Sequence, residues 1–226
     1  METRKERSPE IKKIRLIHGA HSVTQADIWL VEAEGRACVL RDYSSPRSFL
    51  ARALCRWAVR REIRAHRLLD GIEGIPKLVR VLDADRYLMD YIEGKPLSEL
   101  FQNPPGEGFF ASLTRLVAEM HERGVAHGDL RNKNILVGPG EQPSLVDFST
   151  AWWRDPWWRR PLFRLFRLID RRRLAKTIIK LAPGTLSEKE HASLERLPVF
   201  FRLGRLYRKR IYPWLRARRK DLDKGA

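Results

Sequence analysis

The chain has 226 residues, of which 43% are hydrophobic and 32% are charged, and its formal net charge is +17. The hydrophobic content is sufficient for a folded core and excludes a wholly disordered protein. Its two cysteines, Cys38 and Cys55, argue against a disulfide-stabilised scaffold and fit a reducing compartment.

The positive charge is concentrated near the C-terminal end. Residues 151–226 hold 22 basic and 7 acidic side chains, a net charge of +15, whereas residues 1–150 hold 23 and 21, a net charge of +2. The charged N-terminal residues lack the apolar core of a signal peptide. No apolar run of about 18 residues is present that could span a bilayer. We therefore expect a cytoplasmic protein whose basic third contacts an anionic partner.

The first elements predicted along the chain are strands. Residues 11–17 alternate weakly, and residues 27–33 and 37–40 are rich in apolar and β-forming side chains. Glu34-Gly35 between the last two segments is typical of a tight hairpin turn. The pattern predicts three consecutive strands with short connections.

Residues 48–69 are predicted to form a helix, because apolar residues recur at steps of three and four. Glu62 falls on this apolar stripe, where a buried carboxylate needs a cation. Two interpretations remain: a partner elsewhere in the fold, or a local pair with Arg61 or His66. The predicted stripe consists of Leu50, Leu54, Ala58, Ala65 and Leu69.

Two further elements precede the most polar part of the chain. Residues 86–97 have the pattern of a buried strand that ends in a glycine turn. A helix is predicted next, and Gly124 stops it. Its apolar stripe comprises Phe109, Leu113, Leu116, Val117 and Met120.

The most informative segment is 127–137, which reads HGDLRNKNILV and is followed by Leu145-Val146-Asp147. It places Asp129 five residues before Asn134, and Asp147 thirteen residues after Asn134. A short apolar strand, a glycine-rich turn and a return strand predict a hairpin that brings Asn134 and Asp147 side by side. Phosphoryl transfer needs such groups, because a carboxylate orients the acceptor hydroxyl while an amide and a second carboxylate hold the metal.

These segments resemble the catalytic loop and the D-F-G metal motif of the protein-kinase-like superfamily. The H-G-D-L variant is most similar to its atypical branches, which include the RIO-type kinases, the aminoglycoside and choline phosphotransferases, and the bacterial lipopolysaccharide-core sugar kinases. The resemblance implies ATP and Mg²⁺ (or Mn²⁺) as cofactors. It also implies Asp129 as the catalytic base, Arg131 as a contact to the transferred phosphate, and Asn134 and Asp147 as metal ligands.

The resemblance extends to the N-terminal half. Arg41 stands where the superfamily carries a lysine in its third strand, and Glu62 where it carries a helix glutamate, so the two would pair and contact the nucleotide phosphates. The backbone from Asp90 to Ile92 would bind adenine. Arginine keeps the charge but is planar and forked. Together with Ser149, this substitution leaves a pseudokinase, acting as a membrane or partner binding module, as an alternative.

The implied fold class is α+β, a protein-kinase-like two-lobed fold with a reduced, basic C-terminal lobe. The small lobe is expected at 10–92, with an antiparallel sheet and one helix, and the catalytic lobe at 93–226. Only 77 residues follow Ser149, too few for the peptide-docking helices of an ordinary protein kinase. The favoured acceptor is a hydroxyl of a lipopolysaccharide-core glycolipid sugar. The alternative is a RIO-like kinase that phosphorylates protein serine or threonine.

The basic C-terminal region has its own pattern. Tryptophans gather at 152–158, residues 161–173 predict a helix with interspersed arginines, and residues 202–210 mix apolar and basic side chains. Such segments suit an anionic membrane surface, so residues 152–220 are expected to place the protein peripherally on the inner face of the plasma membrane. Two alternatives stay open: a nucleic-acid patch, which ranks lower because no RNA-binding motif is present, and simple packing against the lobe.

Overall fold

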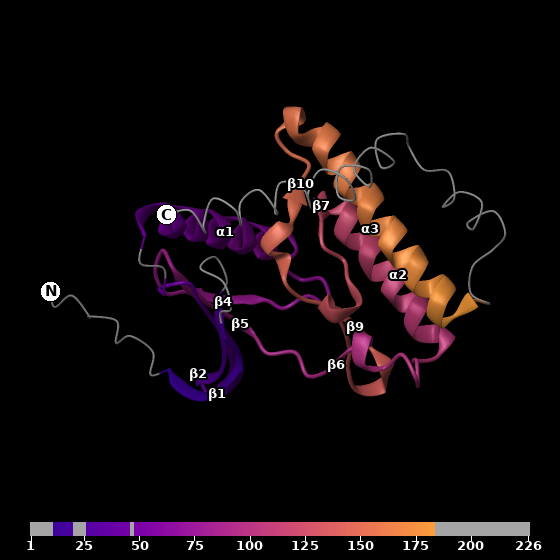
Figure 1. Ribbon diagram of the computed structural model, residues 1–226, viewed down its shortest axis with the longest axis horizontal. Helices are drawn as coiled ribbons and strands as arrows, with labels where there is room; N and C mark the ends of the chain where they lie inside the picture. The colour runs from indigo at the N-terminus through magenta and orange to yellow at the C-terminus, as the bar shows by residue number, and fades with distance from the viewer. Residues whose placement is uncertain (1–10, 20–25, 46–47, 184–226) are drawn as a thin grey trace, which may run out of the picture. The chain divides into compact units, whose positions relative to one another are not determined.

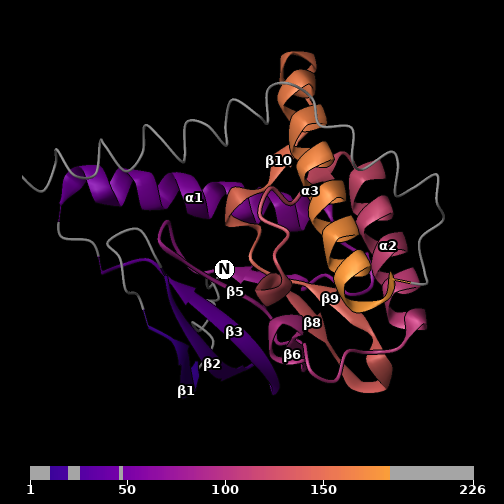
Figure 2. The same cartoon turned by 45° about the vertical axis from the view of Figure 1, so that its right-hand side comes forward.

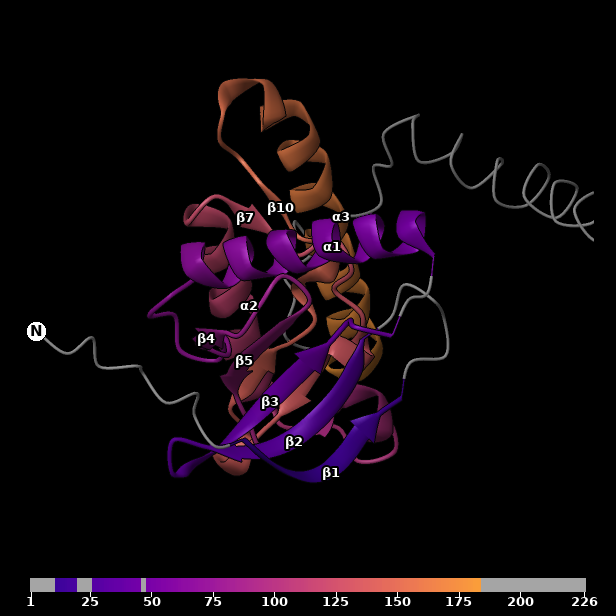
Figure 3. The same ribbon diagram turned by 90° about the vertical axis from the view of Figure 1, so that its left-hand side faces the viewer.

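The computed structural model of the protein describes residues 11–19, 26–45 and 48–183. The N-terminal part is a five-stranded antiparallel sheet with strand order β1-β2-β3-β5-β4. One helix, α1, lies across this sheet (Figure 1, Figure 3). The elements are β1 (Lys12–His18), β2 (Asp27–Ala33), β3 (Arg36–Asp42), α1 (Phe49–Leu68), β4 (Leu78–Val81) and β5 (Arg86–Asp90).

The tight turn predicted between β2 and β3 is present. The two strands pair antiparallel up to Ala33 opposite Arg36. Glu34 and Gly35 both have positive φ, at 54° and 73°. Two such residues in succession form the hairpin turn whose twist matches that of the flanking strands. Successive side chains of β3 point to opposite faces of the sheet. Val39 therefore packs toward α1, while Cys38 and Leu40 pack on the other face.

The helix α1 begins after Ser48, whose hydroxyl oxygen accepts a hydrogen bond from the N–H of Ala51 at 3.2 Å. Its buried face differs from the prediction, because Leu50 and Leu54 are 71% and 52% exposed. The first half of the predicted apolar stripe is therefore wrong. The helix sequence contains two overlapping apolar stripes, and contact with the sheet selects one of them. The selected stripe is Cys55, Val59 and Ile63, which pack with Val39, Tyr87 and Met89.

The C-terminal part of the described chain contains two helices that lie side by side, together with short strands (Figure 1, Figure 2). The apolar stripe predicted for the first helix is buried throughout, and Gly124 follows its end with φ of +79°. Helices and strands are β6 (Lys95–Pro96), α2 (Glu107–Glu122), β7 (Val125–Ala126), β8 (Ile135–Val137), β9 (Pro143–Leu145), β10 (Trp152–Trp153) and α3 (Arg160–Leu181). Short 3-10 turns occur at Leu97–Glu99, Asn132–Asn134, Pro139–Glu141, Phe148–Thr150 and Trp157–Arg159.

The strands of this part form two small sheets, one in the order β6-β8-β9 and one that pairs β7 with β10. The mixed architecture confirms the predicted α+β, kinase-like fold class with a small lobe. The division of the chain at residue 92 stays a prediction, and the predicted amphipathic segment at 202–210 lies outside the described residues. Within the described ranges, none of the helices is long and apolar enough to cross a membrane.

Candidate active site

The loop that carries Asp129 is anchored by a buried carboxylate from α3. Asp170 is fully buried, and its two oxygens accept hydrogen bonds from the backbone N–H groups of His127 at 2.7 Å and Gly128 at 2.9 Å. The Nε2 atom of His121 lies 3.2 Å from the same carboxylate. Hydrogen bonds to a charged acceptor offset the cost of burying it. These hydrogen bonds also hold His127 and Gly128, the first residues of the loop after β7, in place.

Sequence reasoning did not single out Asp170, although a signal was present. It is the one carboxylate of α3, and Phe163 and Leu174 lie on either side of it at helical spacing. A carboxylate on an apolar helix face needs donors. The donors are backbone groups 42 and 43 residues away, which no local pattern identifies.

The carboxylate of Asp129, the predicted base, lies between two guanidinium groups. Arg131 donates to Oδ2, and Arg173 of α3 donates to Oδ1 at 2.6 Å. The Asp129 side chain is 18% exposed. Because each oxygen already has a charged donor, an acceptor hydroxyl would have to replace or share one of these arginines.

The predicted hairpin of β8 and β9 is present, and it brings the two predicted metal ligands to the same end. The N–H of Val146 donates to the backbone oxygen of Asn134 at 3.0 Å, and Asp147 follows directly. The Nδ2 atom of Asn134 donates to the carbonyl oxygen of Asp129 at 2.9 Å. This bond leaves the amide oxygen of Asn134 as the atom that can face a cation.

Asp147 has a left-handed backbone conformation, with φ and ψ both 69°. Such strain in a residue other than glycine is uncommon and gathers at functional sites. The hydroxyl of Ser149 donates to its Oδ1 at 2.9 Å, and Nη2 of Arg41 lies 3.4 Å from the same atom. Burial raises the pKa of Asp147, but Arg41 and Ser149 outweigh burial and hold that pKa below its usual value. The side chain is therefore ionised at neutral pH, as a metal ligand must be.

Arg41 connects the sheet to α1 and to the Asp147 loop. Its Nη1 lies 2.9 Å from Oε1 of Glu62, and both side chains are buried. The hydroxyl of Tyr43 donates to Oε2 of Glu62 and accepts from Arg41, each at 3.3 Å. Burial alone would lower the pKa of Arg41, but the Glu62 carboxylate raises it well above its usual value. Glu62 thus pairs across the fold rather than within its own helix, and contact with a nucleotide phosphate stays a prediction.

A column of rings joins α1 to the two loops of the site. The ring centroid of His127 lies 4.7 Å from that of Phe148, and Phe148 meets His66 of α1 at 5.3 Å. The Nε2 atom of His127 lies 3.0 Å from the carbonyl oxygen of Val146. Through these ring contacts, a shift of α1 would displace both the loop that carries Asp129 and the loop that carries Asp147.

The donor set fits a metal ion that arrives with a nucleotide. Asn134 and Asp147 offer one amide oxygen and one carboxylate, and Mg²⁺ in such sites takes one or two protein ligands while phosphates and water complete its shell. In the described part of the chain, no three His, Cys, Asp or Glu side chains are grouped to hold a metal by themselves. The assignment of Asn134 and Asp147 as ligands stays a prediction.

The predicted adenine contacts lie at the end of β5. The N–H of Asp90 donates to the carbonyl oxygen of Lys77 at 2.9 Å, and the Asp90 carboxylate pairs with Arg36 at 3.0 Å. These contacts hold the segment that continues through Ile92. Adenine binding by this backbone stays a prediction.

The tryptophans that follow the site are packed to different degrees. Trp153 pairs with Val125 in the β7–β10 sheet and is 7% exposed. Trp152 stacks on Phe166 of α3 with ring centroids 5.7 Å apart. Trp157 and Trp158 remain 74% and 56% exposed. The packing alternative thus holds for the first two tryptophans.

The arginine run of α3 is not a free basic surface. Arg172 is buried, Arg173 binds Asp129, and Arg171 is exposed. Arg172 and Arg173 therefore do not form a common exposed basic surface with Arg171, and contact of residues 152–220 with a membrane stays a prediction. The helical period turns consecutive residues about 100° apart, so a run of three cannot share one face.

A family model described as RIO domain matches residues 40–162 of the chain. The match contains the predicted catalytic and metal-binding residues and ends within the first turn of α3, before Asp170 and Arg173.

Three relatives share parts of the sequence. A probable SapB synthase of Streptomyces coelicolor is 33% identical over 112 residues, which are 40% of this chain and 12% of that protein. The KEOPS complex subunit Bud32 of Pyrococcus abyssi is 34% identical over 71 residues, 30% of this chain and 32% of that subunit. A probable serine/threonine-protein kinase of Dictyostelium discoideum is 29% identical over 91 residues, 40% of this chain and 14% of that protein. The chain therefore spans at most about a third of these relatives.

Proposed function

The chain belongs to the RIO-domain family of the protein-kinase-like superfamily, and on that premise we propose that it transfers the γ-phosphate of ATP to a hydroxyl group. The observation that carries the proposal is the convergence of Asp129, Asn134 and Asp147 at one end of the β8–β9 hairpin. Arg41 adds to it, because one guanidinium reaches both Glu62 and Asp147.

In this proposal each residue has a separate task. Asp129 accepts a hydrogen bond from the acceptor hydroxyl and orients it for attack. Asn134 and Asp147 hold the divalent ion, and Arg131 contacts the phosphate being transferred. Bound ATP with its metal supplies the phosphoryl group and the charge neutralisation. Arg41, fixed by Glu62, provides positive charge beside the phosphates.

We infer that the acceptor is a protein serine or threonine rather than a sugar. The family match and the relative named as a serine/threonine-protein kinase support this RIO-like alternative. The predicted lipopolysaccharide-core sugar has no support in the relatives described above, and neither has the predicted peripheral membrane location. A role within a protein complex is a further proposal, which draws on the relative named as a KEOPS complex subunit.

The test is nucleotide binding and phosphate transfer with the full chain. ATP and Mg²⁺ together should raise the unfolding temperature, by an amount that corresponds to about 2.7 kcal/mol at a ligand concentration of 100 Kd. Asp147→Asn should abolish the metal-dependent part of this shift. Asp129→Asn should keep the shift and lower phosphate transfer at least about a hundredfold.

The matched control is Asp155→Asn, because Asp155 is an exposed carboxylate paired only loosely with Arg154 at 3.5 Å. It should behave as the parent protein. Protein extract and bacterial glycolipid, offered in parallel with labelled ATP, separate the two acceptor classes. Stabilisation by ATP without transfer to either acceptor would favour the pseudokinase alternative, which rests on Arg41 and Ser149.

A further inference from the structure

Two grooves lie outside the candidate active site, and arginines line both. The first, of about 870 Å³, runs between α2 and α3. The second, of about 810 Å³, lies between α1, β10 and the residues that follow β4. Asp129, Asn134 and Asp147 line neither groove. The proposed phosphotransfer therefore makes no use of them.

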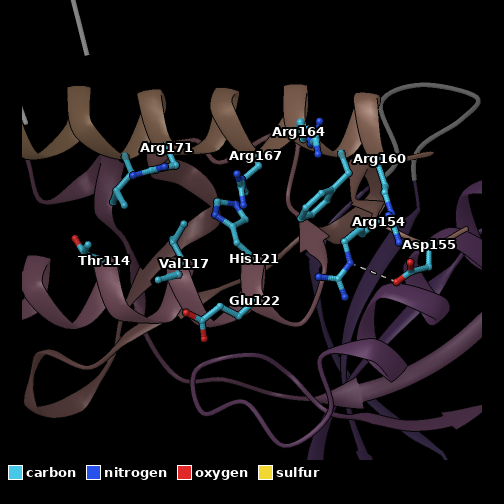
Figure 4. Close-up of a pocket in the computed structure, with 13 residues that line it drawn as sticks. Thr114, Val117, His121, Glu122, Arg154, Asp155, Arg160, Arg164, Arg167 and Arg171 are labelled. Carbon is cyan, nitrogen blue, oxygen red and sulfur yellow. Dashed lines mark hydrogen bonds and ion pairs between the residues drawn. The ribbon is translucent and has the colours of Figure 1, made fainter. Parts of the chain in front are cut away.

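The first groove has a row of exposed arginines on α3. Figure 4 shows this row on α3, with Arg160, Arg167 and Arg171 extending toward α2. Neighbours in the row are three or four residues apart, so they repeat about once per 5.4 Å turn of the helix. Two carboxylates, Glu122 and Asp155, line the groove against five arginines. The arginines are Arg154, Arg160, Arg164, Arg167 and Arg171.

The second groove interleaves arginines with tryptophans. The guanidinium of Arg61 lies 4.4 Å from the ring centroid of Trp57 and 5.4 Å from that of Trp152. The guanidinium of Arg159 lies 4.3 Å from the centroid of Trp153 and 5.1 Å from that of Trp152. Guanidinium groups this close to indole rings give the groove a lining that is both positive and aromatic.

Among the described residues, no carboxylate pairs with the arginines of the second groove, although Nη2 of Arg61 donates to the backbone oxygen of Ala151 at 2.6 Å. The Nε and Nη1 atoms of Arg159 and the Nε atom of Arg61 are buried and have no hydrogen-bond partner among the described residues. Burial lowers the pKa of Arg61, and the neighbouring Arg159 lowers it further. Asp83, the carboxylate that lines this groove, is engaged by Arg86 at 2.7 Å. An anion bound in the groove would offset the repulsion between these guanidinium groups.

The two grooves meet at one segment of the chain. Arg159 lines the second groove and its neighbour Arg160 lines the first. Basic side chains of the segment 152–160 therefore line both grooves, with Arg159 in the second and Arg154 and Arg160 in the first. The two grooves together hold more cations than a single phosphate group would need, which suits a polyanion.

We propose that the two grooves together bind single-stranded nucleic acid. Guanidinium groups of both grooves would pair with successive phosphates, and bases would stack on Trp57 and on the arginine planes beside it. An acidic peptide would match the charge, but its carboxylates would not stack on the indole rings. A membrane would need one flat basic face, whereas these arginines line two grooves. The combination of aromatic planes and positive charge favours a nucleic acid strand.

The test is fluorescence anisotropy with the full chain and a labelled single strand of about 20 nucleotides, long enough to cross more than one groove. ATP is left out, so binding is measured independently of the proposed phosphotransfer. Arg64→Ala with Arg67→Ala removes charge from the second groove, and Arg164→Ala with Arg167→Ala removes it from the first. Each pair should weaken binding about tenfold at low salt and lower the salt slope by roughly 1.4.

The matched control is Lys12→Ala with Arg15→Ala, which removes two exposed charges from β1. It should change the affinity less than twofold. Trp57→Ala should weaken binding about tenfold, whereas Trp57→Phe should recover most of the affinity. Trp57 is 55% exposed, and circular dichroism checks that the variants remain folded.

Three outcomes overturn the proposal. The first is the absence of binding at low salt. The second is an equal loss of affinity in the β1 control, which would indicate a diffuse charge effect. The third is competition by polyglutamate or anionic vesicles at the same charge concentration with no effect of Trp57→Ala, which would identify an acidic protein or a lipid surface as the partner.

Discussion

Arg173 on α3 donates a hydrogen bond of 2.6 Å to the carboxylate of Asp129, the predicted base. The two residues are 44 positions apart in the sequence, and Arg173 lies beyond the segment that matches the RIO domain model. The next turn of α3 adds a second link to the same loop, because the hydroxyl of Thr177 donates to Oδ1 of Asn132 at 2.6 Å. The helix that follows the family match therefore forms one wall of the candidate site.

Replacing Arg173 by methionine should lower the rate of phosphate transfer about tenfold while the KM for ATP stays unchanged. The reason is that Arg173 orients Asp129 and has no predicted contact with ATP. Arg173→Lys should restore part of the rate, because it keeps the charge. Lys176→Met, an exposed position on the same helix, controls for the loss of one positive charge. Equal effects of the two methionine variants would show that Arg173 has no positioning role.

Replacing one partner of the buried Arg41–Glu62 pair should lower the free energy of unfolding more than replacing both partners. Arg41→Met leaves the Glu62 carboxylate buried without its guanidinium, which costs about 4 kcal/mol of unfolding free energy. The double variant Arg41→Met with Glu62→Met leaves no uncompensated charge and should lose clearly less. Urea denaturation of the two single variants and the double variant measures the difference. Additive losses would contradict a coupled pair.

Asp170→Asn should destabilise the protein and misplace the catalytic loop. An amide presents its NH₂ group to one of the backbone N–H donors of His127 and Gly128, so a charged hydrogen bond is lost. The expected loss is about 3 kcal/mol of unfolding free energy. The control is Asp155→Asn, which replaces an exposed carboxylate and should change the free energy of unfolding by less than about 0.5 kcal/mol. Chemical denaturation measures both variants, and a loss in Asp170→Asn no larger than in Asp155→Asn would contradict the anchoring role.

His66 should make the protein less stable as the pH falls below neutrality. Burial lowers the pKa of His66 to about 4, although the bond to the carbonyl oxygen of Pro76 opposes this shift. The unfolded state, with a pKa of about 6.5, then binds a proton that the folded state excludes. This contribution to stability is fully present above pH 6.5 and is lost as the pH falls toward 4, at about 1.4 kcal/mol per pH unit.

The measurement is the difference in unfolding free energy between the parent and His66→Asn at several pH values. Asparagine keeps an amide donor for Pro76 but does not titrate. The parent should lose about 3 kcal/mol more than the variant between pH 6.5 and pH 4. Parallel pH profiles would show that His66 does not titrate differently in the folded and unfolded states.

The local elements and the order of the polar groups could be predicted from short stretches of sequence. The turn at Glu34 and Gly35, the buried stripe of α2 and the hairpin beside Asn134 all depend on residues close together in the chain. Periodicity and turn chemistry act over a few residues, so they can be found without a structure. The spacing of Asp129, Asn134 and Asp147 is also a local property, and it sufficed to predict a phosphotransfer site.

The side chains that surround this site could not be predicted without the folded structure. Asp170 and Arg173 reach it from a helix more than 40 residues away, and nothing in the local pattern distinguishes Arg173 from the exposed Arg171. The buried face of α1 was likewise selected by the sheet, because two apolar stripes were available and only one met a partner. Contacts between distant segments depend on how whole elements pack, and that packing is set by the complete core rather than by any single stretch of sequence.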